Sequence, residues 1–265
     1  MMKKLALGLS LFFSLFGTAC SAAQSSLAEL SSKAEKGDAD AQFALADRYI
    51  KGTGVQKDIQ QVVSWFEKAA NQGMGLAQFR LGMMYKNGDG VPKDYAQAKM
   101  WLEKAAQQKL PFAEYALGML YYYGNGTPQS YSEAFSWYKK SAEQGFKYAQ
   151  YDLAILYYKG EGVKRDYVQA KTWLEKAATE GYALAQADLG QLYYNGQGVT
   201  QDYQQAKAWY EKAIEQNSAE GWSRLGVMYY KGRGVTQDTP HAIVLFEKGC
   251  AAGDDNACAL VEELK

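Results

Sequence analysis

The chain is poor in the residues from which catalytic and metal sites are usually built. Its 265 residues include one histidine, three cysteines and four prolines, and 29 basic residues balance 29 acidic ones. A single histidine and so few cysteines argue against a metal centre or a thiol nucleophile. A balanced charge gives no electrostatic attraction to nucleic acid or to an anionic membrane. We therefore expect no metal, no cofactor and no nucleic-acid partner.

Long apolar runs are also scarce, and the one that stands out lies at the N-terminus. Residues 5–16 form a largely apolar stretch after Lys3 and Lys4, which is the pattern of an export signal and is too short to span a bilayer. We expect residues 1–23 to be a signal peptide. The tetrapeptide Gly-Thr-Ala-Cys also resembles a lipobox, in which case cleavage precedes Cys20 and Cys20 is lipidated. The mature protein is then periplasmic, or anchored to the outer membrane facing the periplasm, with a lipid as its only membrane contact.

Export leaves two cysteines besides Cys20. Cys250 and Cys258 are an even pair in an oxidising compartment, which predicts a disulfide between them. The alternative is a pair of buried thiols.

What the chain has in abundance is self-similarity. It matches itself at a period of 36 residues, and each unit contains two helical patterns separated by a Gly-x-Gly turn. The period predicts an all-α solenoid of helix pairs. We expect six repeats over residues 37–252, a linker and capping helix over 24–36, and a C-terminal capping helix over 253–265.

Recurring side chains have structural explanations within this repeat. An acceptor four residues after the second glycine is expected to cap the following helix; the acceptors are Asp58, Asp94, Ser130, Asp166, Asp202 and Asp238. Small residues, Leu and Tyr recur at helical spacing in the first helix of each unit, and Trp101, Trp137, Trp173 and Trp209 recur in the second. We expect both sets to form core. Glu-Lys pairs next to the Trp residues are expected to be solvated helix surface.

The consensus A-x3-LG-x2-Y-x2-G-x-GV-x2-D-x3-A-x2-W-x2-KAA resembles the Sel1-like repeat, a relative of the tetratricopeptide repeat, over residues 27–265. The resemblance implies a right-handed superhelix of antiparallel helix pairs and a role as an adaptor in protein complexes. Cys250 and Cys258 resemble the inter-helix disulfide of the cysteine-rich secreted branch of the family.

One face of the first helices is richer in aromatic residues than a solvated face should be. It lies about 140° from the Ala-Leu-Tyr stripe and, by analogy with the tetratricopeptide repeat, lines a concave surface. Rigid aromatic side chains with a polar tip favour protein binding. The alternative is that adjacent first helices pack these side chains against one another. The candidate partner-binding residues are Phe79, Met83, Phe112, Tyr115, Met119, Tyr122, Tyr148, Tyr151, Tyr158, Tyr194 and Tyr230.

Catalysis finds little support in the sequence. The single histidine, His241, occupies a slot where other repeats have Gln, and we expect it to be an exposed polar residue. No G-x-S-x-G turn or phosphate-binding loop is present. We therefore expect a monomeric, non-catalytic scaffold that binds a protein partner. The resemblance leaves two alternatives: an immunity protein that neutralises a secreted antibacterial lipase-type effector, and a weak beta-lactamase of the cysteine-rich branch.

Overall fold

The computed structural model describes residues 26–264, and all regular secondary structure within this range is α-helical. The predicted signal peptide and Cys20 lie outside the described residues. The helices are α2 (Leu27–Glu35), α3 (Ala39–Lys51), α4 (Ile59–Asn71), α5 (Gly75–Asn87), α6 (Tyr95–Gln107), α7 (Pro111–Tyr123), α8 (Tyr131–Glu143), α9 (Lys147–Lys159), α10 (Tyr167–Thr179), α11 (Ala183–Asn195), α12 (Tyr203–Glu215), α13 (Ala219–Lys231), α14 (Thr239–Ala251) and α15 (Asp255–Leu264). The predicted all-α repeat fold is confirmed.

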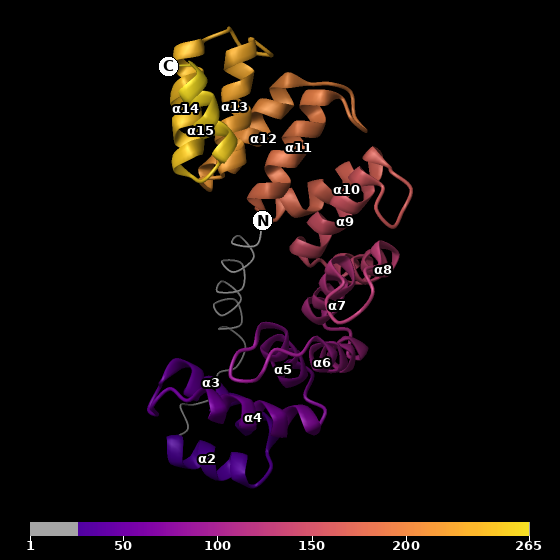
Figure 1. Cartoon of the computed structure of the whole chain (residues 1–265), viewed down its shortest axis with the longest axis vertical. Helices are drawn as coiled ribbons and strands as arrows, with labels where there is room; N and C mark the ends of the chain where they lie inside the picture. The colour runs from indigo at the N-terminus through magenta and orange to yellow at the C-terminus, as the bar shows by residue number, and fades with distance from the viewer. Residues whose placement is uncertain (1–25, 265) are drawn as a thin grey trace. The chain divides into compact units, whose positions relative to one another are not determined.

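The helices belong to two compact units, one ending at Gln72 and the other beginning at Gly73. The first unit contains α2, α3 and α4, and the second contains α5 to α15; the helices are labelled in Figure 1. We call α3, α5, α7, α9, α11 and α13 the first helices, and α4, α6, α8, α10, α12 and α14 the second helices. Each first helix packs against the second helix that follows it. No helix in the described range is long and apolar enough to cross a membrane.

Helix starts and stops follow the predicted signals. The second helices begin at Asp58, Asp94, Ser130, Asp166, Asp202 and Asp238, whose side chains accept backbone N–H groups of the first turn. The first helices end at a glycine in the left-handed conformation. By contrast, α5, α7, α9 and α11 begin without any side-chain cap, so packing rather than capping fixes their first turns.

The two helices of a pair approach closely where the first helix has a glycine. A Cβ on Gly190 would lie 2.6 Å from the ring of Tyr210, and one on Gly226 would lie 2.7 Å from the ring of Phe246. The Leu-Gly pair of the consensus therefore makes room for a large side chain of the second helix. Tyr210 and Phe246 are in consequence almost fully buried, at 1% and 0% exposed.

Successive pairs meet through the second glycine of the Gly-x-Gly turn. A Cβ on Gly162 would collide with the backbone of Tyr131, the first residue of α8, and one on Gly198 would collide with the backbone of Tyr167, the first residue of α10. The turns that contain Gly126, Gly162, Gly198 and Gly234 thus lie against the start of the second helix of the preceding pair. Glycine is required here because the approach is closer than a side chain permits.

A polar clamp closes the helix pairs α3/α4, α5/α6, α7/α8 and α11/α12, and α9/α10 has a longer equivalent in which Gln150 donates to Glu180 at 3.5 Å. A buried Gln or Glu in the second turn of a first helix is hydrogen-bonded to the residue that ends the following second helix, 30 positions later. The pairs are Gln42 with Gln72 (2.8 Å), Gln78 with Gln108 (3.0 Å), Glu114 with Gln144 (2.6 Å) and Gln186 with Gln216 (2.9 Å). These bonds satisfy side chains that would be costly to bury unpaired.

Candidate binding surface

The predicted binding residues described below all lie on first helices of the second unit. In Figure 1, α5 and α7 lie on the inner side of the curved stack of this unit, and α6 and α8 lie on its outer side. Within this unit, the first helices α11 and α13 also contact each other directly. The predicted residues therefore run from one helix pair to the next along one side of the unit.

Ring contacts between successive first helices are extensive. The ring centroids of Phe79 and Phe112 are 4.5 Å apart, and the ring of Tyr182, the N-cap residue of α11, lies 5.2 Å from that of Tyr148 and 5.1 Å from that of Tyr151. Edge-to-face pairs of this kind stabilise packing by roughly 0.5–1.5 kcal/mol each beyond their buried area. The alternative expected from the sequence, aromatic packing between adjacent first helices, is thus present in the structure.

Burial divides the candidate residues into two groups. Met83, Phe112 and Met119 are buried, with 7%, 8% and 5% of their surface exposed, so they support the surface from beneath and do not line it. The others remain half-buried, or exposed in the case of Tyr230 at 37%. We call these accessible residues the tyrosine surface: Phe79, Tyr115, Tyr122, Tyr148, Tyr151, Tyr158, Tyr194 and Tyr230.

The C-terminal ends of the first helices carry a regular series of tyrosine pairs. Tyr122 packs on Tyr131, Tyr158 on Tyr167 and Tyr194 on Tyr203, with ring centroids 5.2–5.3 Å apart. The hydroxyl of Tyr122 donates to Glu161 at 3.3 Å and that of Tyr158 to Gln197 at 3.4 Å, both on the turn of the next pair. Burial raises the pKa of Tyr122 to about 12, helped by Glu161. The hydroxyl of Tyr122 is therefore a neutral hydrogen-bonding group at physiological pH.

Three charged residues that the sequence did not single out lie among these tyrosines. Tyr115 donates a hydrogen bond to Asp152 at 2.9 Å, Tyr151 donates one to Asp188 at 2.9 Å, and Arg224 lies 2.7 Å from Asp188. Burial raises the pKa of Asp152 to about 6. The sequence signal that could have found Asp152 is its place directly after Tyr151, one of the predicted binding residues.

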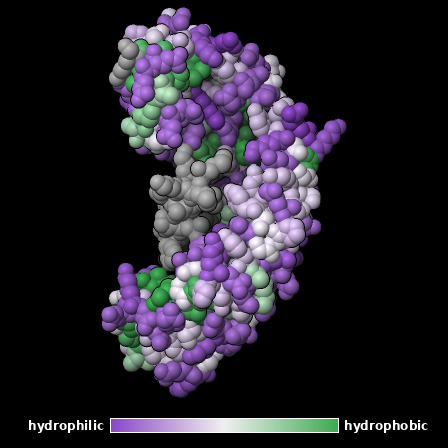
Figure 2. Space-filling view, in the orientation of Figure 1, coloured by the Kyte–Doolittle hydropathy of each residue, from purple (hydrophilic) through white to green (hydrophobic). Residues whose placement is uncertain are grey.

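Hydropathy differs between parts of the second unit. Figure 2 shows mostly pale colours, between strongly hydrophilic and strongly hydrophobic, over the region of α7 to α10. Stronger hydrophobic colour appears near the C-terminal helices α14 and α15.

The tryptophans of the second helices are less buried than expected. Trp101 and Trp173 are buried at 7% and 8% exposed, whereas Trp137 and Trp209 are half-buried. The lysine three positions later lies over each of these four rings, with Nζ 3.9–4.1 Å from the centroid. The interpretation of the Glu-Lys pairs as merely solvated was therefore incomplete, because the lysines cover tryptophan faces.

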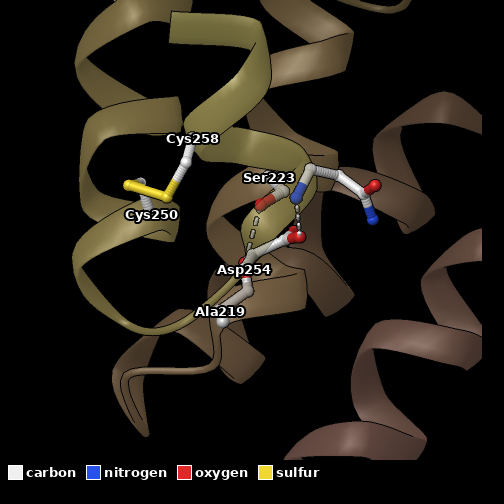
Figure 3. The surroundings of a disulfide bond; sticks show 6 residues. Ala219, Ser223, Cys250, Asp254 and Cys258 are labelled. Atoms are coloured by element: carbon white, nitrogen blue, oxygen red, sulfur yellow. Dashed lines mark hydrogen bonds between the residues drawn. A yellow bond between two sulfur atoms is a disulfide. The ribbon is translucent and has the colours of Figure 1, made fainter.

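The C-terminal end is fixed by the predicted disulfide. Cys250 on α14 and Cys258 on α15 are bonded, with Cα atoms 4.7 Å apart (Figure 3). The same view shows the side chain of Asp254 accepting a hydrogen bond at the start of α15 and Ser223 bonded to the carbonyl of Ala219. His241 is exposed and packs edge-on against Tyr229, which agrees with the polar surface role expected for it.

No group of three or more His, Cys, Asp or Glu side chains in residues 26–264 is arranged to hold a metal ion. Helix pairs repeated every 36 residues, with a side-chain surface on one face, define a helical repeat protein. The chain belongs to the Sel1 repeat family, whose profile matches residues 39–74, 75–110, 111–146, 147–182, 183–218 and 223–254.

Solved structures agree with this assignment. The chain is similar to c5321, described as a protective antigen present in uropathogenic Escherichia coli strains, with 40% identity, a TM-score of 0.83 and 89% of this chain covered. It spans 50% of the length of that antigen. A Sel1 repeat protein from Oxalobacter formigenes is 35% identical, with a TM-score of 0.73 over 82% of this chain and 89% of that chain. No curated protein matches the chain.

Proposed function

We propose that this protein is a non-catalytic scaffold of the bacterial periplasm that binds a protein partner through the tyrosine surface. The observation that carries the proposal is that each first helix from α7 to α13 contributes at least one accessible tyrosine, from Tyr115 to Tyr230. Sel1 repeats suggest protein–protein interaction, and repeat arrays use extended surfaces of this kind for binding. The periplasmic location follows from the predicted signal peptide and is part of the proposal.

Site-specific photo-crosslinking in cells tests the surface directly. A photoreactive amino acid replaces Tyr230, which is 37% exposed, or Val168, which is 58% exposed on the second helix α10. We expect a discrete crosslinked partner, identified by mass spectrometry, from position 230 and none from position 168. The opposite pattern would show that the partner binds elsewhere.

Substitutions then separate binding from folding. Replacing Tyr122, Tyr158 and Tyr194 by phenylalanine keeps the ring pairs and removes three hydroxyls, whereas alanine also removes the rings. Alanine at all three positions should abolish partner binding. Each change removes a ring pair worth roughly 0.5–1.5 kcal/mol and, in addition, the apolar area buried by a half-buried ring, so the free energy of unfolding should fall while the repeat fold remains. A matched triple, Met100→Ala, Val168→Ala and Val244→Ala, changes exposed apolar residues of the second helices and should bind normally.

The two alternatives stay predictions with their own tests. An immunity protein would relieve the toxicity of a co-expressed periplasmic lipase-type effector, and the tyrosine-to-alanine variant would lose that protection. A beta-lactamase would hydrolyse nitrocefin after purification. Location is tested by fractionation, together with metabolic lipid labelling of the wild type and of Cys20→Ala.

A further inference from the structure

Two tyrosine-to-aspartate hydrogen bonds join successive first helices, and only one of the two aspartates also has an arginine partner. The hydroxyl of Tyr151 donates to Oδ2 of Asp188 at 2.9 Å, and Oδ1 of Asp188 lies 2.7 Å from Nη2 of Arg224 on the next first helix. Asp188 is therefore held from both sides, by a tyrosine of the preceding pair and by a guanidinium of the following pair.

Asp152 has only the first of these partners. Tyr115 donates to its Oδ2 at 2.9 Å, which is its one hydrogen bond in the described structure. The residue one repeat further on, which corresponds to Arg224, is Asp188, an acceptor that cannot bond to a carboxylate. Lys159 acts on Asp152 only through its charge, and its Nζ lies 3.8 Å from Glu161. The equivalent positions of the first helices α9, α11 and α13 therefore carry two carboxylates, Asp152 and Asp188, and one guanidinium, Arg224.

An ionised carboxylate packed among tyrosine rings is costly without a cation, because aromatic groups replace its water without neutralising its charge. Asparagine would keep the bond from Tyr115 without that cost. An acid at a position where an amide would be more stable is a candidate binding position. Arginine suits the surroundings better than lysine, since a guanidinium pairs with a carboxylate and stacks on tyrosine rings at once.

We infer that Asp152 receives an arginine side chain of the protein partner, in the way that Asp188 receives Arg224. This inference rests on the function proposed above and names the chemistry of the contact. Tyr123, which is 53% exposed and adjoins the half-buried ring of Tyr122 at 5.0 Å, offers an accessible ring near this position. The partner is thus expected to present an arginine between the first helices α7 and α9.

Small probes test the contact without knowledge of the partner. The purified protein is titrated with N-acetyl-arginine amide or with N-acetyl-citrulline amide, an uncharged analogue of the same shape, while NMR follows the carboxyl carbon of Asp152. We expect the arginine compound to shift this resonance saturably and to move the titration midpoint of Asp152 to lower pH. The citrulline compound should do neither.

Two variants complete the test. In Asp152→Asn, backbone amide shifts of α7 and α9 caused by the arginine compound should disappear, whereas Glu211→Gln, an exposed acid on α12, should leave the response intact. Equal responses to both compounds, or a response that persists in Asp152→Asn, would overturn the inference. With the crosslinked partner, Asp152→Asn should weaken binding by at least about tenfold. Unchanged affinity there, with binding still lost in the tyrosine variants, would refute the arginine contact and leave the scaffold function standing.

Discussion

Replacing Asp152 by asparagine should stabilise the protein at neutral pH, although the change removes a hydrogen-bonded charge. Burial raises the pKa of the Asp152 carboxyl from 3.8 to about 6, and the bond from Tyr115 and the charge of Lys159 oppose this only in part. A raised pKa means that the folded state binds the proton more tightly than the unfolded chain does. Ionisation of Asp152 therefore lowers the free energy of unfolding.

The sign and size follow from the two pKa values. The stability that Asp152 contributes through its bound proton is fully present below the unfolded value of 3.8 and is lost as the pH rises through about 6. This difference corresponds to roughly 3 kcal/mol, at about 1.4 kcal/mol per pH unit. Because the residue keeps partial contact with water, we expect about 2 kcal/mol in favour of Asp152→Asn at about pH 7.5. The advantage should shrink to below about 1 kcal/mol at about pH 4.5, where the wild-type carboxyl is mostly protonated.

Asp188→Asn is the matched control, since it changes the same residue type one repeat later. Asp188 pairs with Arg224, and loss of its charge would leave that guanidinium without a carboxylate, so we expect a loss of about 2 kcal/mol. Far-UV circular dichroism during denaturant unfolding at the two pH values measures both variants. An Asp152→Asn protein that is less stable than the wild type at neutral pH, or whose advantage is the same at both pH values, would refute the reasoning.

Three further changes probe the repeat itself. Lys109 has a left-handed backbone, with φ at 57°, at a position where most repeats have glycine. Lys109→Gly should therefore raise the free energy of unfolding by about 1 kcal/mol. Asn217→Gly should change it less, because asparagine tolerates this conformation. Gly162→Ala should lower the free energy of unfolding by more than about 2 kcal/mol. Gly145→Ala is the control, because its Cβ would meet no atom within 4 Å; an equal loss there would show that the contact of Gly162 with α8 is unimportant. Reduction of the disulfide should destabilise the C-terminal end by roughly 2–3 kcal/mol and increase amide exchange in α15, whereas unchanged exchange would show that packing alone holds the helix.

The fold could be predicted from the sequence because its signals are local and repeated. Asp58 caps a helix through its own neighbours, and Gly52 ends one through its own backbone conformation. The period then multiplies each signal by the number of repeats. Such features depend on a few adjacent residues and need no knowledge of how distant segments meet.

The binding surface could be predicted only in outline. Helical periodicity placed Met83, Phe112 and Met119 on the same face as the tyrosines, but it could not show that neighbouring helices cover them. The bond from Tyr115 to Asp152 joins residues 37 positions apart, one more than the period. A pattern counted at one period cannot reveal contacts that cross from one repeat to the next at a different spacing.

The Gly-x-Gly turn lies against the main chain of the second helix of the preceding pair, and this contact affects how such an array can lengthen. The turn that contains Gly162 touches the backbone of Tyr131 and Ser132, atoms that every residue type possesses. A duplicated segment of 36 residues would contain both the turn glycine and the helix start that the next turn contacts. It could therefore dock on the existing array whatever its side chains are. Gene duplication can therefore lengthen the array without any compensating substitution. The residues at outward-facing positions can then change and bind new ligands.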